Sequence, residues 1–205
     1  MQLKQHWETI YSQRSADSLS WYQEHAGTSL RLIAETQLEG SAPIIDVGGG
    51  ASTLVDGLLA AGYTNLTVLD LSAAALDVSK RRLGPEAARA VTWIEADILD
   101  AVFPGEAYEL WHDRAIFHFL TSRDERQRYV RTMLHAVRHG GWIIMATFAE
   151  EGPDRCSGLP AMRYTPEALQ EELGSSLVLC QQSKELHSTP SGAVQIFQYC
   201  MFQKQ

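Results

Sequence analysis

Three aspartates are placed where they could bind a nucleoside. Asp46 precedes a run of three glycines, Asp70 ends the next apolar run, and Asp97 follows the one after that. Because the carboxyl ends of neighbouring parallel strands meet over one crevice, a doubly wound sheet would bring all three together. A carboxylate there accepts hydrogen bonds from both ribose hydroxyls, which favours ribose binding at Asp70 and base contact at Asp97. The alternatives are a helix-start role for Asp70 and a solvated turn at Asp97.

The glycine run indicates what kind of ligand this would be. An apolar run over 44–47, the glycines Gly48, Gly49 and Gly50, and an apolar-periodic segment over 54–61 have the order strand, tight turn, helix. A dinucleotide fingerprint needs a third glycine where Thr53 stands. Asp46 would repel a pyrophosphate and would favour a cation such as an ammonium or sulfonium. The sequence therefore favours a cationic nucleoside over a dinucleotide.

The elements that must position these residues alternate between strands and helices. Apolar periodicity and turn residues predict helices over 29–37, 54–61, 73–83, 123–139 and 166–173, and strands over 44–47, 66–71, 91–95, 108–112, 142–148, 177–182 and 193–202. This alternation predicts right-handed crossovers and a mostly parallel sheet. The last two strands, joined without a helix, are expected to form an antiparallel pair at its edge.

Composition limits the function classes. The chain has 205 residues, which predicts a single domain over 1–205, and its formal net charge of −8 argues against a nucleic-acid-binding surface. Three widely spaced cysteines form neither a metal-binding pattern nor a disulfide framework, which suits a reducing cytosol. No apolar run reaches the roughly 18 residues of a membrane span. We expect a cytoplasmic protein without a metal, a nucleic-acid partner or a membrane partner.

Residues 1–27 form an arm rich in aromatic side chains, namely Trp7, Tyr11, Trp21 and Tyr22. Trp7 and Tyr11 are four residues apart and share one face of a short helix. The arm could simply anchor the N-terminus to the core, since each ring buries a large area. Alternatively it could be a lid, with Trp21 on a cofactor and Tyr11 and Tyr22 on a second substrate.

Taken together, Asp46-Val47-Gly48-Gly49-Gly50, Asp70 and Ala96-Asp97 resemble the class I S-adenosylmethionine-dependent methyltransferases, over about residues 28–202. The resemblance implies a doubly wound seven-stranded sheet with a reversed last strand and helices on both faces. It implies S-adenosylmethionine as cofactor and S-adenosylhomocysteine as product. The implied cofactor residues are Asp46 and the glycines at the methionine part, Asp70 and Leu71 at the ribose, and Asp97 and Ile98 at the adenine. Ser52 replaces the family's third glycine.

Two later segments are the candidates for the acceptor side. Asp113, Arg114 and His118 follow the fourth strand, whose end lies beside the reactive methyl group in this fold. Asp113 and Arg114 could act there or form an internal salt bridge, and His118 could be a general base or a packed histidine. The loop after the fifth strand holds Arg155, suited to an anionic acceptor or to its acidic neighbours, and Cys156, a reactive thiol or a small packed side chain.

The reaction this implies is methyl transfer to an oxygen, nitrogen or sulfur of a small-molecule acceptor. Such a transfer needs alignment and exclusion of water more than it needs an enzyme nucleophile. A protein lysine methyltransferase is the second hypothesis, because an acidic surface suits a basic target. A cofactor-binding protein without turnover is the third.

Overall fold

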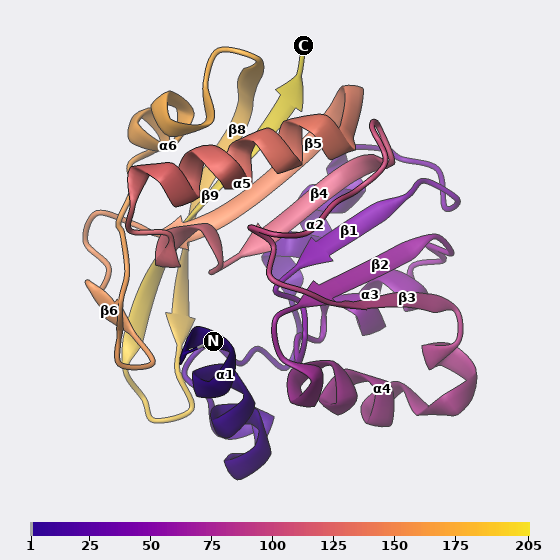
Figure 1. Ribbon diagram of the computed structural model, residues 1–205, viewed down its shortest axis with the longest axis vertical. Helices are drawn as coiled ribbons and strands as arrows, with labels where there is room; N and C mark the ends of the chain where they lie inside the picture. The colour runs from indigo at the N-terminus through magenta and orange to yellow at the C-terminus, as the bar shows by residue number, and fades with distance from the viewer. Residues whose placement is uncertain (1) are drawn as a thin grey trace.

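The computed structural model describes residues 2–205, and its centre is one seven-stranded sheet (Figure 1). The strand order is β3-β2-β1-β4-β5-β9-β8. Only β9 is antiparallel to its neighbours, which confirms the predicted fold class with its reversed last strand. The strands of this sheet are β1 (Ile44–Val47), β2 (Leu66–Asp70), β3 (Val91–Glu95), β4 (Tyr108–Arg114), β5 (Val137–Phe148), β8 (Leu177–Ser188) and β9 (Val194–Lys204).

Helices cover both faces of the sheet. The α-helices are α1 (Gln2–Gln13), α2 (Gly27–Glu35), α3 (Leu54–Ala60), α4 (Ala73–Ala88), α5 (Arg123–Ala136) and α6 (Pro166–Leu173). Figure 1 shows α5 in front of the sheet and α2 and α3 behind it. Within residues 2–205, no helix has both the length and the apolar character needed to cross a bilayer.

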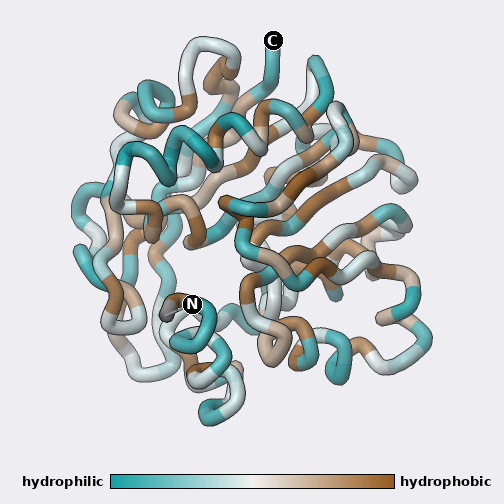
Figure 2. The backbone as a smooth tube through the Cα atoms, viewed as in Figure 1, coloured by the Kyte–Doolittle hydropathy of each residue, from teal (hydrophilic) through white to brown (hydrophobic). Residues whose placement is uncertain are grey.

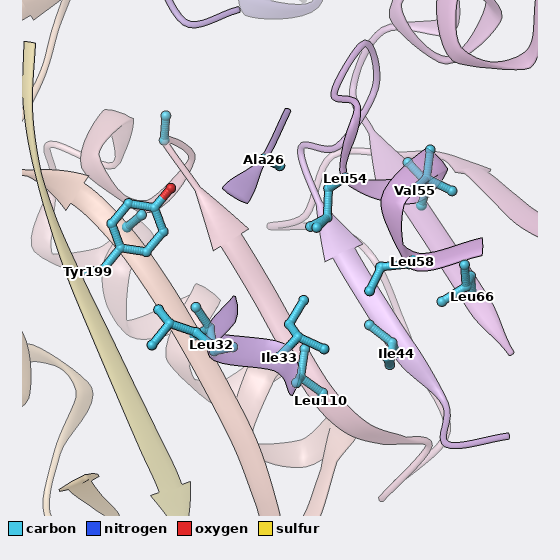
Figure 3. Close-up of a cluster of buried hydrophobic side chains, with 14 of the residues drawn as sticks. Ala26, Leu32, Ile33, Ile44, Leu54, Val55, Leu58, Leu66, Leu110 and Tyr199 are labelled. Carbon is cyan, nitrogen blue, oxygen red and sulfur yellow. The ribbon is translucent and has the colours of Figure 1, made fainter. Parts of the chain in front are cut away.

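The core consists of two layers because successive strand residues point to opposite faces. Ile44 packs with Leu32 and Leu58 from α2 and α3 (Figure 3), whereas the adjacent Ile45 packs in the other layer with Met133 of α5. Figure 2 shows the corresponding pattern, with brown apolar strands in the centre and teal on the outer turns of the front helix. Both faces of the central strands are therefore buried, as expected for a parallel sheet.

Several element boundaries differ from the sequence prediction. The predicted helix over 123–139 ends at Ala136, because Val137 is extended and begins β5. The Lys204 amino group donates to the carbonyls of Leu134 and Val137, 2.7 Å from each, and satisfies the exposed end of the helix. The helix predicted to stop at 83 resumes after Gly84, which has φ 77°, and Pro85 opens the new turn.

The long connection after β5 was predicted as a loop but contains a short hairpin. β6 (Arg155–Cys156) pairs antiparallel with β7 (Leu159–Pro160). The turn between them uses Ser157 and Gly158, both with positive φ. This hairpin gives Cys156 a fixed place beside the carboxyl ends of the strands, as described below.

Candidate functional site

Two adjoining cavities lie at the carboxyl ends of β1, β2 and β4. Helix α1 lies at the same end of these strands (Figure 1). The larger has a volume of about 370 Å³ and the smaller about 50 Å³. Both are lined by Tyr11, Trp21, Gly48 and Arg114. The position agrees with the rule that open parallel sheets bind ligands beyond the carboxyl ends of their strands.

The smaller cavity contains a buried carboxylate that is only half satisfied. Asp46 and His112 are neighbours in the β1–β4 register, and Asp46 Oδ1 lies 2.7 Å from His112 Nδ1. Asp46 Oδ2 has no hydrogen-bond partner among the described residues. A buried carboxylate oxygen without a partner is costly, so this atom is suited to a donor brought by a ligand.

Arg114 places an opposite charge at the same cavity. Its Nε donates to the Tyr199 hydroxyl over 3.1 Å and its Nη1 to the Trp21 carbonyl over 3.0 Å. Nη2 lies 3.6 Å from Glu185 Oε1, within ion-pair range, but within residues 2–205 it makes no hydrogen bond. The guanidinium also lies over the Phe197 ring, 4.3 Å from its centroid. Arg114 therefore keeps one buried donor unused.

Asp113 does not reach the cavities. It is fully buried on the opposite face of β4, where its carboxylate accepts the backbone N–H groups of Ile116 and Phe117 and the Tyr129 hydroxyl. Burial raises its pKa to about 6, although these hydrogen bonds lower it. The Asp113–Arg114 salt bridge considered from sequence is not formed, because successive strand residues point to opposite faces of the sheet. Asp113 instead holds the turn after β4.

His118 is also absent from the lining of both cavities. It is fully buried, with its ring 4.4 Å from the Phe119 centroid and 4.5 Å from that of Phe148. Burial lowers its pKa to about 3, with a smaller contribution from the Arg114 charge. This environment matches the packed histidine that was the alternative to a general base.

The three positions of the glycine turn have no room for a side chain, because other atoms of the protein lie too close. Gly48 has φ +73°, and an added Cβ there would lie 2.1 Å from Ile116 Cγ1. A Cβ on Gly49 would lie 2.2 Å from Asp46 Oδ2, the unpartnered oxygen. Gly50 lines neither cavity, and its N–H donates to Asp70. The sequence reasoning assigned these glycines to ligand approach, but their immediate neighbours are side chains of the site itself.

The larger cavity extends over the ends of β2 and β3. Its lining includes Asp70, Leu71, Asp97 and Ile98. Asp70 accepts the N–H groups of Gly50 over 3.0 Å and of Ser72 over 2.8 Å, and burial raises its pKa to about 6 against these two hydrogen bonds. Asp97 Oδ1 accepts the Leu99 N–H over 2.9 Å. Both carboxylates thus hold local turns while facing the cavity.

The N-terminal arm covers the cavities. Trp7, Tyr11 and Trp21 all line the larger cavity, and Trp7 also packs edge-on against Phe119, with centroids 5.4 Å apart. Tyr22 lines the smaller cavity. Burial raises the pKa of Tyr11, so its hydroxyl, which accepts from Trp21 Nε1 over 3.1 Å, stays protonated at neutral pH. The arm is both packed on the domain and part of the cavity wall.

Glu8 fixes α1 to the domain. Its two carboxylate oxygens accept the N–H groups of Ala73, over 2.7 Å, and Ala74, over 3.3 Å, at the start of α4. These are among the amides that a helix N-terminus leaves unpaired, and the helix dipole favours an anion there. Lys4 adds an exposed ion pair with Glu95. A side chain outside α4 therefore supplements its N-cap residue, Ser72.

The hairpin forms the remaining wall. The larger cavity is lined by Cys156, Leu159 and Pro160 of the hairpin, in addition to Asp70 and Asp97. Burial raises the pKa of Cys156 to about 11, so it is a neutral thiol at neutral pH. Arg155 is exposed, lines neither cavity and donates to the Gly158 carbonyl across its own turn. The structure therefore brings Cys156 to the site and leaves Arg155 outside it.

Comparison with known proteins finds a family model that matches part of the chain. The family model "Methyltransferase domain" matches residues 44–141, which include β1, the glycine turn, Asp70, Asp97 and β4. Residues 44–141 are thus similar to a methyltransferase domain. No protein of curated function matches its sequence.

Solved structures similar to this chain share its fold at low sequence identity. A methyltransferase from Anabaena variabilis is 13% identical with TM-score 0.75, covering 99% of this chain and 93% of that one. A Burkholderia thailandensis 1,6-didemethyltoxoflavin-N1-methyltransferase is 16% identical with TM-score 0.75, covering 99% and 87%. A protein described for thioacetal formation in echinomycin biosynthesis is 16% identical with TM-score 0.75, covering 99% and 92%.

Sequence reasoning missed three residues that support the candidate site. His112 and Ser29 support Asp46, and Glu8 caps α4. His112 could have been noticed as one of the ionisable residues of β4, together with Glu109, Asp113 and Arg114. Ser29 and Glu8 gave no such signal, because their partners are distant in sequence.

A pH-dependent stability is expected from Asp113. Its folded-state pKa, about 6, lies above the ordinary value of 3.8, so the folded protein binds the proton more tightly than the unfolded chain. The free energy of unfolding should therefore fall as the pH rises from about 4 to about 6. Asp113→Asn should flatten this dependence, measured by urea denaturation at several pH values. A slope that Asp113→Asn leaves unchanged would contradict the assignment.

A loosened arm is expected from Glu8→Ala. Loss of a helix-capping carboxylate costs about 0.5–2 kcal/mol, so α1 should open roughly 2- to 30-fold more often. Hydrogen exchange of the α1 amides, followed by mass spectrometry, measures this. Gln5→Ala, at an exposed position on the same helix, is the control and should leave exchange unchanged. Equal exchange in both variants would show that Glu8 does not fix the arm.

Proposed function

We propose that this protein transfers the methyl group of S-adenosylmethionine to an oxygen, nitrogen or sulfur of a small-molecule acceptor. The observation that carries the proposal is a pair of buried atoms of opposite charge, Asp46 Oδ2 and Arg114 Nη2. Both residues line one cavity, and within residues 2–205 neither atom has a hydrogen-bond partner. An α-amino acid end carries an ammonium and a carboxylate, which are the two groups that such a pair binds.

The residues of the site fit the cofactor. Asp46 would bind the ammonium of the methionine part and Arg114 its carboxylate. Asp70 would accept the ribose hydroxyls, with Leu71 beside them, and Asp97 with Ile98 would hold the adenine side. The raised pKa of Asp70, about 6, supports this role, since two donating hydroxyls would stabilise its charged form. Arg114 is thus proposed as a cofactor residue, in place of the catalytic role expected from sequence.

The enclosed acceptor side supports a small acceptor. Beyond Arg114 the larger cavity is lined by Ile116, Phe119, Cys156 and Leu159, under the cover of α1. These walls are apolar, and a closed apolar wall excludes water from the reaction. A mostly apolar cavity with a few polar groups suits a small organic acceptor.

The chemistry requires little of the enzyme beyond alignment. Bound S-adenosylmethionine supplies a methyl group on a positively charged sulfur, from which a neutral thioether leaves. Asp113 and His118 line neither cavity, and Cys156 with its pKa of about 11 does not accept a proton at neutral pH. None of these three residues therefore serves as a general base, and the arm and the hairpin would hold the acceptor in line with the methyl group.

Two measurements test the proposal. Calorimetry should show that the protein binds S-adenosylhomocysteine, and that Asp70→Ala abolishes this binding. Asp77→Ala, at an exposed carboxylate on α4, is the matched control and should leave it unchanged. Incubation with methyl-labelled cofactor and a cell lysate, separated into protein and small-molecule fractions, should then place the label in the small-molecule fraction.

Each other outcome contradicts a part of the proposal. Absence of binding would overturn the cofactor assignment. Label found only in protein would favour a protein lysine methyltransferase, and binding without any transferred label would favour a non-catalytic protein.

A further inference from the structure

A chain of four polar contacts connects the two charged residues of the smaller cavity. Arg114 Nε donates to the Tyr199 hydroxyl over 3.1 Å. The hydroxyls of Tyr199 and Ser29 lie 3.5 Å apart, the longest of the four contacts. Ser29 Oγ lies 2.9 Å from His112 Nε2, and His112 Nδ1 lies 2.7 Å from Asp46 Oδ1. The chain crosses from β4 to β9, to α2, back to β4 and then to β1.

The two ends of this chain and the tautomer of His112 together set the direction of its hydrogen bonds. An ionised carboxylate only accepts, so His112 Nδ1 donates to Asp46, and in the tautomer with its proton on Nδ1 the Nε2 atom accepts from Ser29. Ser29 has then used its only proton and accepts from Tyr199. The Tyr199 oxygen in turn accepts from Arg114, which can only donate. All donors thus point from the cation to the anion.

The three connecting side chains are in an apolar environment. Ser29 and Tyr199 are fully buried and line neither cavity, and His112 is 2% exposed. Figure 3 shows Tyr199 near Leu32, in the apolar layer on the α2 side of the sheet. Buried polar groups are stabilising only when each finds its partner, so a complete chain here tends to hold one arrangement.

We propose that His112, Ser29 and Tyr199 are positioning residues that fix Asp46 and Arg114 for the amino acid end of the cofactor. This inference rests on the proposed function. With Oδ1 held by His112, Asp46 keeps Oδ2 as its single free oxygen. With Nε held by Tyr199 and Nη1 by the Trp21 carbonyl, Arg114 keeps Nη2 as its free donor. Without the chain, each charged side chain turns toward another partner.

A pair of ligands separates positioning from general stability. S-adenosylhomocysteine contains the amino acid end, whereas 5′-methylthioadenosine has the same nucleoside but lacks that end. Calorimetry measures both affinities for each variant. Ser29→Ala and His112→Leu should weaken the binding of S-adenosylhomocysteine about 10- to 100-fold, which is the usual loss when a hydrogen bond to a charged group is disturbed. Both variants should leave the affinity for 5′-methylthioadenosine unchanged. His112→Asn, whose amide donates near the place of Nδ1, should restore most of the affinity.

Matched tyrosines provide the control. Tyr199→Phe removes the hydroxyl that belongs to the chain of polar contacts and should weaken only the binding of S-adenosylhomocysteine. Tyr164→Phe removes a buried hydroxyl that lines neither cavity and has no hydrogen-bond partner within residues 2–205, and it should change neither affinity. Ser29→Ala deletes one oxygen, so it keeps the test valid if His112→Leu does not fold.

Two results would contradict the positioning role while the proposed function stands. One is an equal loss of affinity for both ligands in the variants of Ser29, His112 and Tyr199, which would indicate a purely structural role. The other is an unchanged affinity for S-adenosylhomocysteine. Failure of the wild-type protein to bind S-adenosylhomocysteine would instead contradict the proposed function itself.

Discussion

Two charged side chains, Asp46 and Arg114, are withdrawn from water while their own hydrogen bonds satisfy them only in part. Removing such groups from water costs several kcal/mol each unless partners replace the lost hydration. The protein supplies some of these partners through His112, Tyr199 and the Trp21 carbonyl. The two unpaired atoms belong to residues that line one cavity, for which we propose a ligand with an ammonium and a carboxylate. The arm and the C-terminal strands are both tied to this arrangement.

Strand alternation decides which polar residues can take part. Asp46 on β1 and His112 and Arg114 on β4 face the layer of α2, whereas Asp113 faces α5. A shift of one residue in β4 would exchange these roles. The register, in which Asp46 is paired with His112 and Val47 with Asp113, therefore assigns one residue to the cavity and its neighbour to the support of a turn.

The fold was predictable because its signals are local. The order of the elements follows from apolar runs, from glycine and proline turns and from helix caps such as Ser72. The strand ends that line the candidate site were indicated by Asp46, Asp70 and Asp97. The end of α5 was wrong because Val137 is drawn into the sheet by its pairing with Tyr108, a contact that no helical period reveals. The face on which each β4 side chain lies was equally hidden. It depends on register, which only the assembled sheet sets.

The most direct test is a crystal structure of the protein with bound S-adenosylhomocysteine. The amino group of the ligand should lie within hydrogen-bond distance of Asp46 Oδ2 and its carboxylate within that distance of Arg114 Nη2, with the His112 contact to Asp46 preserved. A ligand whose amino acid end points elsewhere, or an Asp46 that turns away from His112 to bind it, would contradict the account.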